Sequence, residues 1–493
     1  MAELNFYILF CSFAAVLGSF QYGYHIGELN IPQDVISCKK IPKDTVLSEY
    51  SLSPCIKMND AEVGLVTAIF TLGGLLGSLL ASRVADSKGR RQTLLLNNFF
   101  LGIAPIIMGF ANSVSTLVFG RVLVGIGCGV VTVVVPMYLA EISPVEYRGT
   151  FGVMNQLGIV TGILFSQLVG LYLSYVPGWR LILLGGAVIS IIQIIVLGFS
   201  VESPRFLASR PGGFHSAKRA LQKLRGNADI ENELGGWQQV ASEEVIADDD
   251  NVPLSLGSED GDAITADPAD PPPVVFRAHT RSDGFDVWKF LTSPHYRPAL
   301  KVILLAHSTQ QLSGINAVLY YSTNILSKIL PDSSDLITVY ISVVNTLMTL
   351  VSAYLMDRSG RRTLLLYSIG SMSAASALLG FGIIHDYGFL SALSIILFVA
   401  TFSFGLGPIP FLITPEIVDT HAAATASSLG MGLNWVSNFI IGFVFLSVSK
   451  MIGGYVFYIF AIYLAGSFIL ARRLVPETKA KTVEEVWRGW TGK

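Results

Sequence analysis

The chain of 493 residues contains twelve apolar runs of about 20 residues, each long enough to cross the hydrocarbon core of a membrane as a helix. Inside a bilayer every backbone polar group must find a partner within the protein, so an uninterrupted run of this length folds as a helix. We therefore expect an all-α integral membrane protein with twelve transmembrane helices. The runs lie at about 5–27, 62–82, 92–112, 116–140, 149–174, 180–200, 298–328, 335–356, 363–384, 389–414, 425–449 and 453–471.

Composition supports this class and excludes others. Charged residues make up only 14% of the chain, against roughly 25% in soluble domains, so an ordinary soluble enzyme is excluded. The net charge of −2 argues neither for nor against nucleic acid, and the sequence contains no zinc-ligand or phosphate-loop pattern. We expect no nucleic-acid partner, metal or cofactor. The first run has no basic leader or cleavage site and is interpreted as a span. We expect a lipid-embedded protein that acts as a monomer.

One charged segment occurs twice, each time between two apolar runs. Asp86 to Arg91 reads Asp-Ser-Lys-Gly-Arg-Arg, and Asp357 to Arg362 reads Asp-Arg-Ser-Gly-Arg-Arg. The repeat predicts a duplicated bundle with matching charged turns. Its halves are 1–201 and 298–473, joined by a linker at 202–297 and followed by a tail at 474–493. Parallel six-span halves place a substrate site at their interface near the membrane midplane.

Positive charges set the expected orientation. Short loops rich in Lys and Arg stay cytoplasmic, and most of these residues fall in alternate connections. Both termini and the linker are therefore expected inside, in the plasma membrane or the vacuolar membrane. Within the linker, 229–283 holds fourteen Asp or Glu against two Arg, which is typical of disorder. We interpret it as a solvated tether, with a regulatory role as the alternative.

The four cysteines fall in two settings. Cys11 and Cys128 lie within apolar runs and are expected to be packing residues. Cys38 and Cys55 lie in the one sizeable outer loop, about 28–60, where an oxidising compartment permits a disulfide. Two free thiols are the alternative.

Carboxylates and arginines gather at the cytoplasmic ends of the expected spans. The planar guanidinium suits bidentate carboxylate pairing, and we expect an inner gate of ion pairs that hold the halves together and separate when the inside opens. The alternative is that these charges only fix topology, since each exposed pair is worth about 0–1 kcal/mol. The gate set is Asp86, Arg90, Arg91, Glu141, Arg148, Glu202, Arg205, Asp357, Arg361, Arg362 and Glu416.

The seventh run carries an unusual number of amides and phenols. Gln310, Gln311 and Asn316 precede Tyr320 and Tyr321, and Gly314 would permit a bend. Carboxamides offer both donors and acceptors, which suits a neutral, polyhydroxylated ligand. One such amide more often joins helices than binds a ligand, but several spans contribute here. The other amides are Asn155, Gln156, Gln167, Asn345, Asn434 and Asn438.

Acids are nearly absent inside the spans. Glu28 and His25 at the outer end of the first run are the candidate proton site, since proton-coupled carriers use such groups. The alternative, to which we give equal weight, is a structural role in which His25 donates a hydrogen bond to a backbone carbonyl. The lack of a central Asp favours facilitated diffusion.

These residues give the chain a close resemblance to the sugar porters of the major facilitator superfamily. The signatures are Gly120-Arg121, Pro136-x-Tyr138-x-x-Glu141, Glu202-Ser-Pro-Arg205, Gln310-Gln-x-Ser-Gly-Ile-Asn316, Gly407-Pro-Ile-Pro410 and Pro476-Glu-Thr-Lys479. They span everything except about 229–283. The first span and Phe411 are also similar to fungal members linked to vacuolar protein sorting.

The resemblance implies roles for particular residues. It implies that hexose is held by Gln156, Gln310, Gln311, Asn316, Asn345, Phe411 and Asn434. It also implies that Tyr320 and Tyr321 form an outer gate. Several positions depart from the family pattern: Phe411 replaces a frequent Trp, Ser403 replaces a glutamate of the glucose facilitators, His307-Ser308-Thr309 replaces the Gln-Leu-Ser set, and Ala423 replaces an expected arginine.

We therefore expect a carrier that moves a monosaccharide, a hexose, by alternating access and without enzymatic chemistry. A proton-coupled symporter is the first alternative. A sensor or sorting factor that binds sugar without carrying it is the second.

Overall fold

The structure, a computed structural model, describes residues 5–40, 52–144, 147–210, 212–226, 230, 287–327, 330–479, 481 and 483–491. Every regular element within these residues is a helix. The first group comprises α1 (Phe6–Gly27), α2 (Gln33–Ile36), α3 (Asp60–Lys88), α4 (Arg90–Gly109), α5 (Val114–Ile142), α6 (Arg148–Leu173), α7 (Trp179–Gly198), α8 (Pro204–Ala208) and α9 (Phe214–Arg225). The second comprises α11 (Val287–Thr292), α12 (Arg297–Leu312), α13 (Ile315–Ser327), α14 (Ser334–Ser359), α15 (Arg361–Ile384), α16 (Gly388–Phe404), α17 (Ile409–Glu416), α18 (Thr420–Ile452), α19 (Tyr455–Leu474) and α20 (Val483–Thr491).

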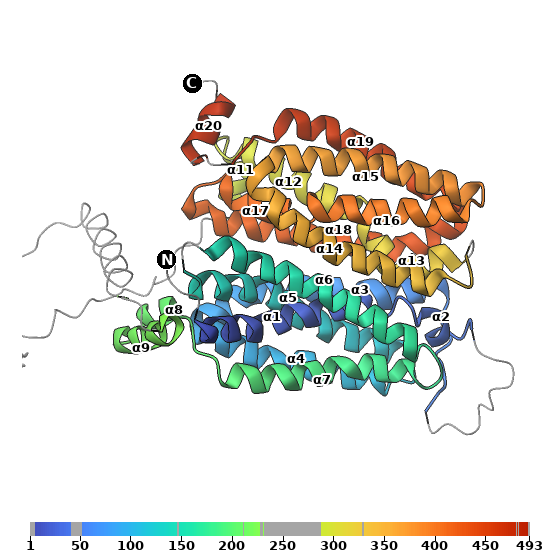
Figure 1. Cartoon of the computed structure of the whole chain (residues 1–493), viewed down its shortest axis with the longest axis horizontal. Helices are drawn as coiled ribbons and strands as arrows, with labels where there is room; N and C mark the ends of the chain where they lie inside the picture. Colours follow the sequence, from blue (N-terminus) through green and yellow to red (C-terminus); the bar gives the residue numbers. More distant parts are fainter. Residues whose placement is uncertain are drawn as a thin grey trace, which may run out of the picture.

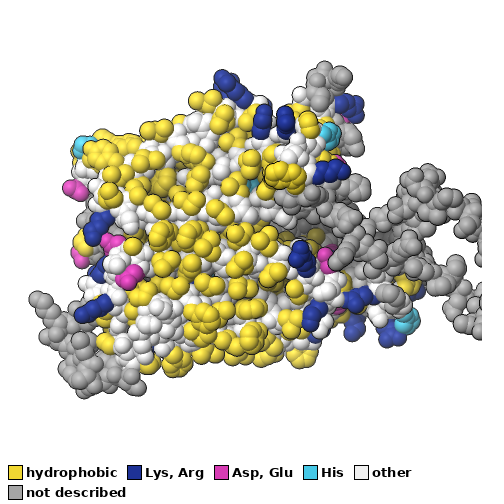
Figure 2. Space-filling model, turned by 180° about the vertical axis from the view of Figure 1, so that it is seen from behind, with side chains coloured by type: hydrophobic (Ala, Val, Ile, Leu, Met, Phe, Trp, Pro, Cys, Tyr) yellow, Lys and Arg dark blue, Asp and Glu magenta, His cyan; other side chains and the backbone are white. Residues whose placement is uncertain are grey.

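The long helices form two bundles that lie side by side (Figure 1). One bundle contains α1 and α3–α7, and the other contains α12–α19. The two chain ends and the short helices α8, α9 and α20 lie at one end of the molecule, and α2 lies at the opposite end. Hydrophobic side chains cover the middle of the face in Figure 2, and the charged side chains gather at the two ends. This is the surface of a protein whose middle lies in lipid.

Eleven helices in the described part of the chain are long and apolar enough to cross a membrane, with α16 and α17 counted together over Gly388–Glu416. The run expected at 298–328 is the remaining span, and it consists of two shorter helices, α12 and α13. The expected all-α membrane architecture is confirmed, with the seventh span broken in two.

The break in the seventh span lies at Gly314. Its φ is +90°, a conformation that residues with a side chain rarely adopt. A Cβ atom there would also lie 2.6 Å from the ring of Phe460. The run expected at 389–414 is broken as well, because α16 ends at Phe404 and α17 begins at Ile409. Both breaks fall in the C-terminal bundle.

Glycines let the helices of the N-terminal bundle approach closely. A Cβ atom at Gly125 of α5 would lie 1.9 Å from the backbone oxygen of Phe70 in α3. A Cβ atom at Gly162 of α6 would lie equally close to the oxygen of Phe20 in α1. Since apolar side chains gain little by leaving lipid, such close backbone packing is what holds membrane helices together.

The last helix, α20, packs on the end of the C-terminal bundle. Trp487 donates its indole N–H to the oxygen of Ile417 (3.1 Å), and its ring stacks on His295 at 4.2 Å. Next to it, the hydroxyl of Tyr296 donates to Asp419. Burial and this carboxylate raise the pKa of Tyr296 to about 12, so the phenol is protonated and serves as a donor.

Candidate functional site

Three amides form a cluster where the seventh span breaks, and a fourth, Gln310, accepts a hydrogen bond from them. Gln311 of α12 donates to Asn434 of α18 (2.9 Å), and Asn316 of α13 donates to Gln311. Asn434 in turn donates to Gln310. All four side chains are at least 92% buried, with exposed fractions of 2–8%. The cluster joins the two pieces of the seventh span to the eleventh, and it contains no charge.

Gln310 has a different place from the one expected. Its amide donates to the backbone oxygens of Gly407 (2.5 Å) and Leu406 (3.1 Å), in the break between α16 and α17. Those oxygens have no intrahelical partner at a helix end. Gln310 therefore supports the broken tenth span, and only its oxygen faces the amide cluster.

The other expected sugar contacts are spread over three helices. The hydroxyl of Ser403 donates to the oxygen of Asn345 (2.8 Å), so Asn345 is already bonded. Phe411 is 40% exposed on α17, with its ring against His307 at 5.3 Å. Gln156 is half-buried on α6. It makes no hydrogen bond within the part of the chain that the structure describes.

The two tyrosines expected at the outer gate are buried between α13 and α18. Tyr320 donates its hydroxyl to Asn438 (2.9 Å), and Tyr321 donates to the oxygen of Gly442 (2.6 Å). Tyr321 also lies where the helix departs from helical geometry, at φ −134°. Both rings therefore lie on α13, beyond the break in the seventh span and toward the end of the molecule that holds α2 (Figure 1).

Asn30, at the end of α1, connects the two bundles at this outer end. Its amide donates to the oxygen of Leu319 (2.9 Å) and the hydroxyl of Ser322 (2.8 Å), and its oxygen accepts from the N–H of Thr323 (3.3 Å). The sequence analysis missed this residue. A buried amide directly after an apolar run was the available signal. The structure is closed on the side of α2.

Charges on the outer surface reinforce that closure. Asp60 of the N-terminal bundle pairs with Lys450 of the C-terminal bundle (2.9 Å) and with Lys39 of the outer loop (2.7 Å). Cys38, next to Lys39, forms a disulfide with Cys55 in the structure. The loop, the first bundle and the second bundle therefore meet at one carboxylate.

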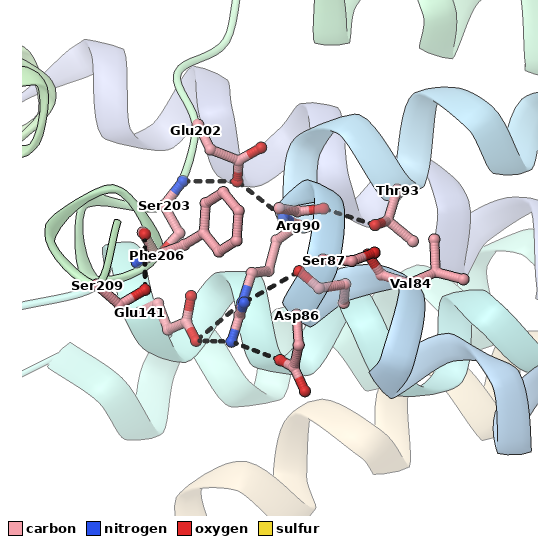
Figure 3. Close-up of polar contacts among 12 residues, drawn as sticks. Val84, Asp86, Ser87, Arg90, Thr93, Glu141, Glu202, Ser203, Phe206 and Ser209 are labelled. Carbon is pink, nitrogen blue, oxygen red and sulfur yellow. Dashed lines mark hydrogen bonds and ion pairs between the residues drawn. The ribbon is translucent and has the colours of Figure 1, made fainter. Parts of the chain in front are cut away.

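The first charged turn is shown in Figure 3. Arg90 pairs with Glu141 of α5 at 3.0 Å and with Asp86 at 3.5 Å. Glu202 accepts the backbone N–H groups of Arg90 (2.8 Å) and Arg91 (3.0 Å) at the start of α4. A carboxylate at a helix N-terminus satisfies free N–H groups and opposes the positive end of the helix dipole.

The second turn repeats this arrangement. Arg361 pairs with Glu416 at 3.2 Å, and Glu416 also accepts from the hydroxyl of Thr478. Glu477 takes the position of Glu202, because it accepts the backbone N–H groups of Arg361 (2.9 Å) and Arg362 (3.2 Å). Each of these pairs joins groups of the same bundle, so among the described side chains the ion pairs do not bridge the bundles at this end.

Three expected gate arginines pair with no acid among the described residues, and the side chains of two further gate residues lie outside the described part. Arg91 donates to the oxygen of Leu197 (2.8 Å) and Arg362 to that of Arg472 (2.8 Å), so the second arginine of each turn caps the C-terminal end of a later helix, α7 or α19, instead of pairing with an acid. Arg205 is exposed on α8 and pairs with no acid among the described residues, because Glu202 is held by backbone N–H groups. The side chains of Arg148 and Asp357, and all of 231–286, lie outside the described part.

The candidate proton site is a buried charge cluster. Glu28, fully buried, accepts from Arg121 (2.7 Å) and bonds to His25 (2.9 Å). Arg121 also donates to the backbone oxygens of His25, Val66 and Thr67. The sequence analysis found the acid and the histidine but not their arginine partner, which neutralises the carboxylate.

Comparisons with known proteins agree with these features. A family model described as "Sugar (and other) transporter" matches residues 11–249 and 276–490. The chain belongs to the sugar transporter family. A probable metabolite transport protein of Saccharomyces cerevisiae is 36% identical, with 98% of this chain and 96% of that protein covered. Facilitated glucose transporter member 3 of solute carrier family 2 from Mus musculus is 35% identical, with 98% and 93% covered.

This sugar transporter also matches solved structures. The inward open conformation of the xylose transporter XylE from E. coli superposes with a TM-score of 0.73 over 98% of this chain and all of that one, at 22% identity. The likeness shows a shared major facilitator fold. The protein is thus a multi-pass membrane transporter and not an enzyme.

Proposed function

We propose that this sugar transporter carries a monosaccharide, a hexose, across the membrane by facilitated diffusion. The observation that carries the proposal is the uncharged cluster of Gln311, Asn316 and Asn434 at the break of the seventh span. Amides that bond to one another can exchange those bonds for sugar hydroxyls, and they offer a donor and an acceptor each. Glucose transport by the mouse relative, which shares 35% identity, supports the same substrate class.

The proposed substrate set extends this cluster with residues from three other spans and with Gln310 of the same span. Gln156 provides an amide that is not yet bonded, Asn345 one that is shared with Ser403, and Phe411 a ring face. Gln310 completes the set through its oxygen. Tyr320 and Tyr321 form the outer gate. The pairs Arg90–Glu141 and Arg361–Glu416 each lie within one bundle, so the charged residues of the inner gate pair across the bundles only when this end closes.

The cycle follows from the state observed. We take the end that holds α2 as the outer one; there Asn30 and Asp60 bond across the two bundles, and Tyr320 and Tyr321 are buried. For sugar to enter from outside, α13 must swing away from α1 while α12 stays in place, which the break at Gly314 permits. Sugar can drive the cycle only by binding its states unequally. We propose that the transporter acts as a monomer in the plasma membrane or the vacuolar membrane, with both termini in the cytoplasm.

Uptake of labelled hexose into proteoliposomes tests the site. Asn434→Ala removes the acceptor of the Gln311 amide and the donor to the Gln310 oxygen, together with the proposed sugar contacts, at a cost of about 1–3 kcal/mol. The sugar concentration for half-maximal uptake should therefore rise by roughly 5–100-fold. Asn324→Ala, on α13 but outside the cluster, is the matched control. Equal uptake by the two variants would contradict the assigned site, and no uptake by the wild-type protein would favour a sensor.

A proton-coupled mechanism is the second candidate, favoured by the buried Glu28. Under a pH gradient, a symporter accumulates sugar against its concentration gradient, and Glu28→Gln should abolish that accumulation but retain exchange of labelled for unlabelled sugar. A facilitator should reach the same equilibrium level with and without the pH gradient. Accumulation by the wild-type protein would therefore overturn the proposed facilitated diffusion.

A further inference from the structure

The short helix α9 carries a cationic stripe that faces away from the bundle. His215, Arg219 and Lys223 follow one another at intervals of four residues and are all exposed. The opposite side of the helix, Ala217 and Leu221 included, is buried. Figure 1 shows α9 beyond the end of the N-terminal bundle, at the end where both termini lie. We call these three residues the α9 stripe.

The segment that follows α9 has the opposite charge. Residues 229–262 contain eleven Asp or Glu and no Lys, Arg or His. Ile230, within this segment, is 5% exposed and packs against Leu221 and Phe214 of α9. The chain therefore returns onto α9 at the point where its acidic stretch begins.

We propose that the acidic segment 229–262 docks on the α9 stripe and keeps it from the anionic lipid headgroups of the inner leaflet. The tether between the two is only a few residues long, so the segment is present at millimolar effective concentration. An anionic membrane surface attracts the same lysine and arginine. The acidic segment and the anionic membrane surface therefore compete for the α9 stripe. The segment has the advantage when the membrane contains little anionic lipid, because it is part of the same chain.

Distance measurement between spin labels tests the proposal on the full chain. We place labels at Gln222→Cys on α9 and Ala247→Cys in the segment, in nanodiscs of neutral phosphatidylcholine. Cys11 and Cys128 are buried and Cys38 is bonded to Cys55, so the native cysteines do not compete for label. A free chain of this length gives a broad distribution around roughly 25–30 Å. Docking predicts a narrower and shorter distribution at low salt, which broadens at 0.5 M salt, where the screening length is about 4 Å.

Charge removal distinguishes the outcomes. Arg219→Gln with Lys223→Gln should broaden the distribution at low salt, and the matched pair Arg472→Gln with Arg473→Gln at the end of α19 should not. A distribution that is broad in every condition overturns the proposal. So does a broad distribution in neutral lipid combined with charge-dependent binding of α9 to phosphatidylserine nanodiscs, which would assign the stripe to lipid. Deleting 231–262 should increase the retention of the protein by phosphatidylserine vesicles several-fold.

Discussion

Glu28 is a fully buried carboxylate at the end of a membrane span, where an unpaired charge is costly. A charge there is tolerated only because Arg121 bonds to it at 2.7 Å and His25 at 2.9 Å. Arg121 also has a ring beneath it, since its guanidinium lies 4.5 Å from the centre of Phe70. The cluster fastens α1 to α3 and α5 by polar bonds that lipid cannot replace.

Removing one member of this cluster should therefore be worse than removing two. Arg121→Gln leaves an unpaired buried carboxylate, at about 3–5 kcal/mol, and should lower the melting temperature of the purified protein markedly. Arg121→Gln with Glu28→Gln should recover most of the loss. Thermal unfolding in detergent by fluorescence measures both variants. A double variant less stable than the single one would show that the ion pair is not what holds the three helices.

For single residues, the sequence predicted which side chains belong to the site better than it predicted their hydrogen-bond partners. Gln310, Gln311 and Asn434 were all expected at the site, but the support that Gln310 gives to the broken tenth span depends on a break that a single sequence does not place. Asn30 was not expected because its partners, Leu319 and Ser322, lie in the other half of the chain. Pairs so far apart in sequence carry no local signal.

Among the helices, the broken seventh span is the element on which the proposed cycle depends. Gly314→Ala should disturb it twice, because the backbone is at φ +90° and the added methyl group would meet Phe460 at 2.6 Å. Strain of this kind costs of order 1–3 kcal/mol. We expect a lower melting temperature and slower uptake, both measured on purified protein. Gly466→Ala in α19, where a Cβ atom meets nothing within 4 Å, is the matched control and should behave as wild type.

Helices were the best-predicted elements, for a physical reason. An apolar run of about 20 residues has one structure available in lipid, so the positions of the spans followed from composition alone. The break between α16 and α17 was missed because Gly405 to Pro408 interrupts the helix without interrupting the apolar run. The role of Glu477 was missed for a similar reason, since only the folded turn shows that it matches Glu202.

For the whole molecule, the duplicated turns explain how the two bundles are built alike. In each, a glycine ends one helix, the first arginine pairs with an acid, and a distant glutamate accepts the N–H groups of both arginines. A repeat of this kind specifies contacts inside each half, which is why it was readable from the sequence. Contacts between the halves are not repeated in the sequence and could not be predicted from it. In the proposed cycle, these are the contacts that change during transport.

Asp60 offers a test of that closure at the outer surface. Asp60→Asn should weaken its pair with Lys450, which joins the two bundles and is worth about 0–1 kcal/mol because it is exposed. The outward-open population should therefore rise by up to roughly fivefold. A cysteine at Ala68, which packs against Gly442 of the other bundle, should then react faster with an impermeant maleimide added outside. High salt should produce part of the same increase in the wild-type background. Asp332 is an exposed acid that forms no ion pair among the described residues, so Asp332→Asn should leave the labelling rate unchanged. If both substitutions raised it equally, net surface charge rather than the Asp60 link would control the opening.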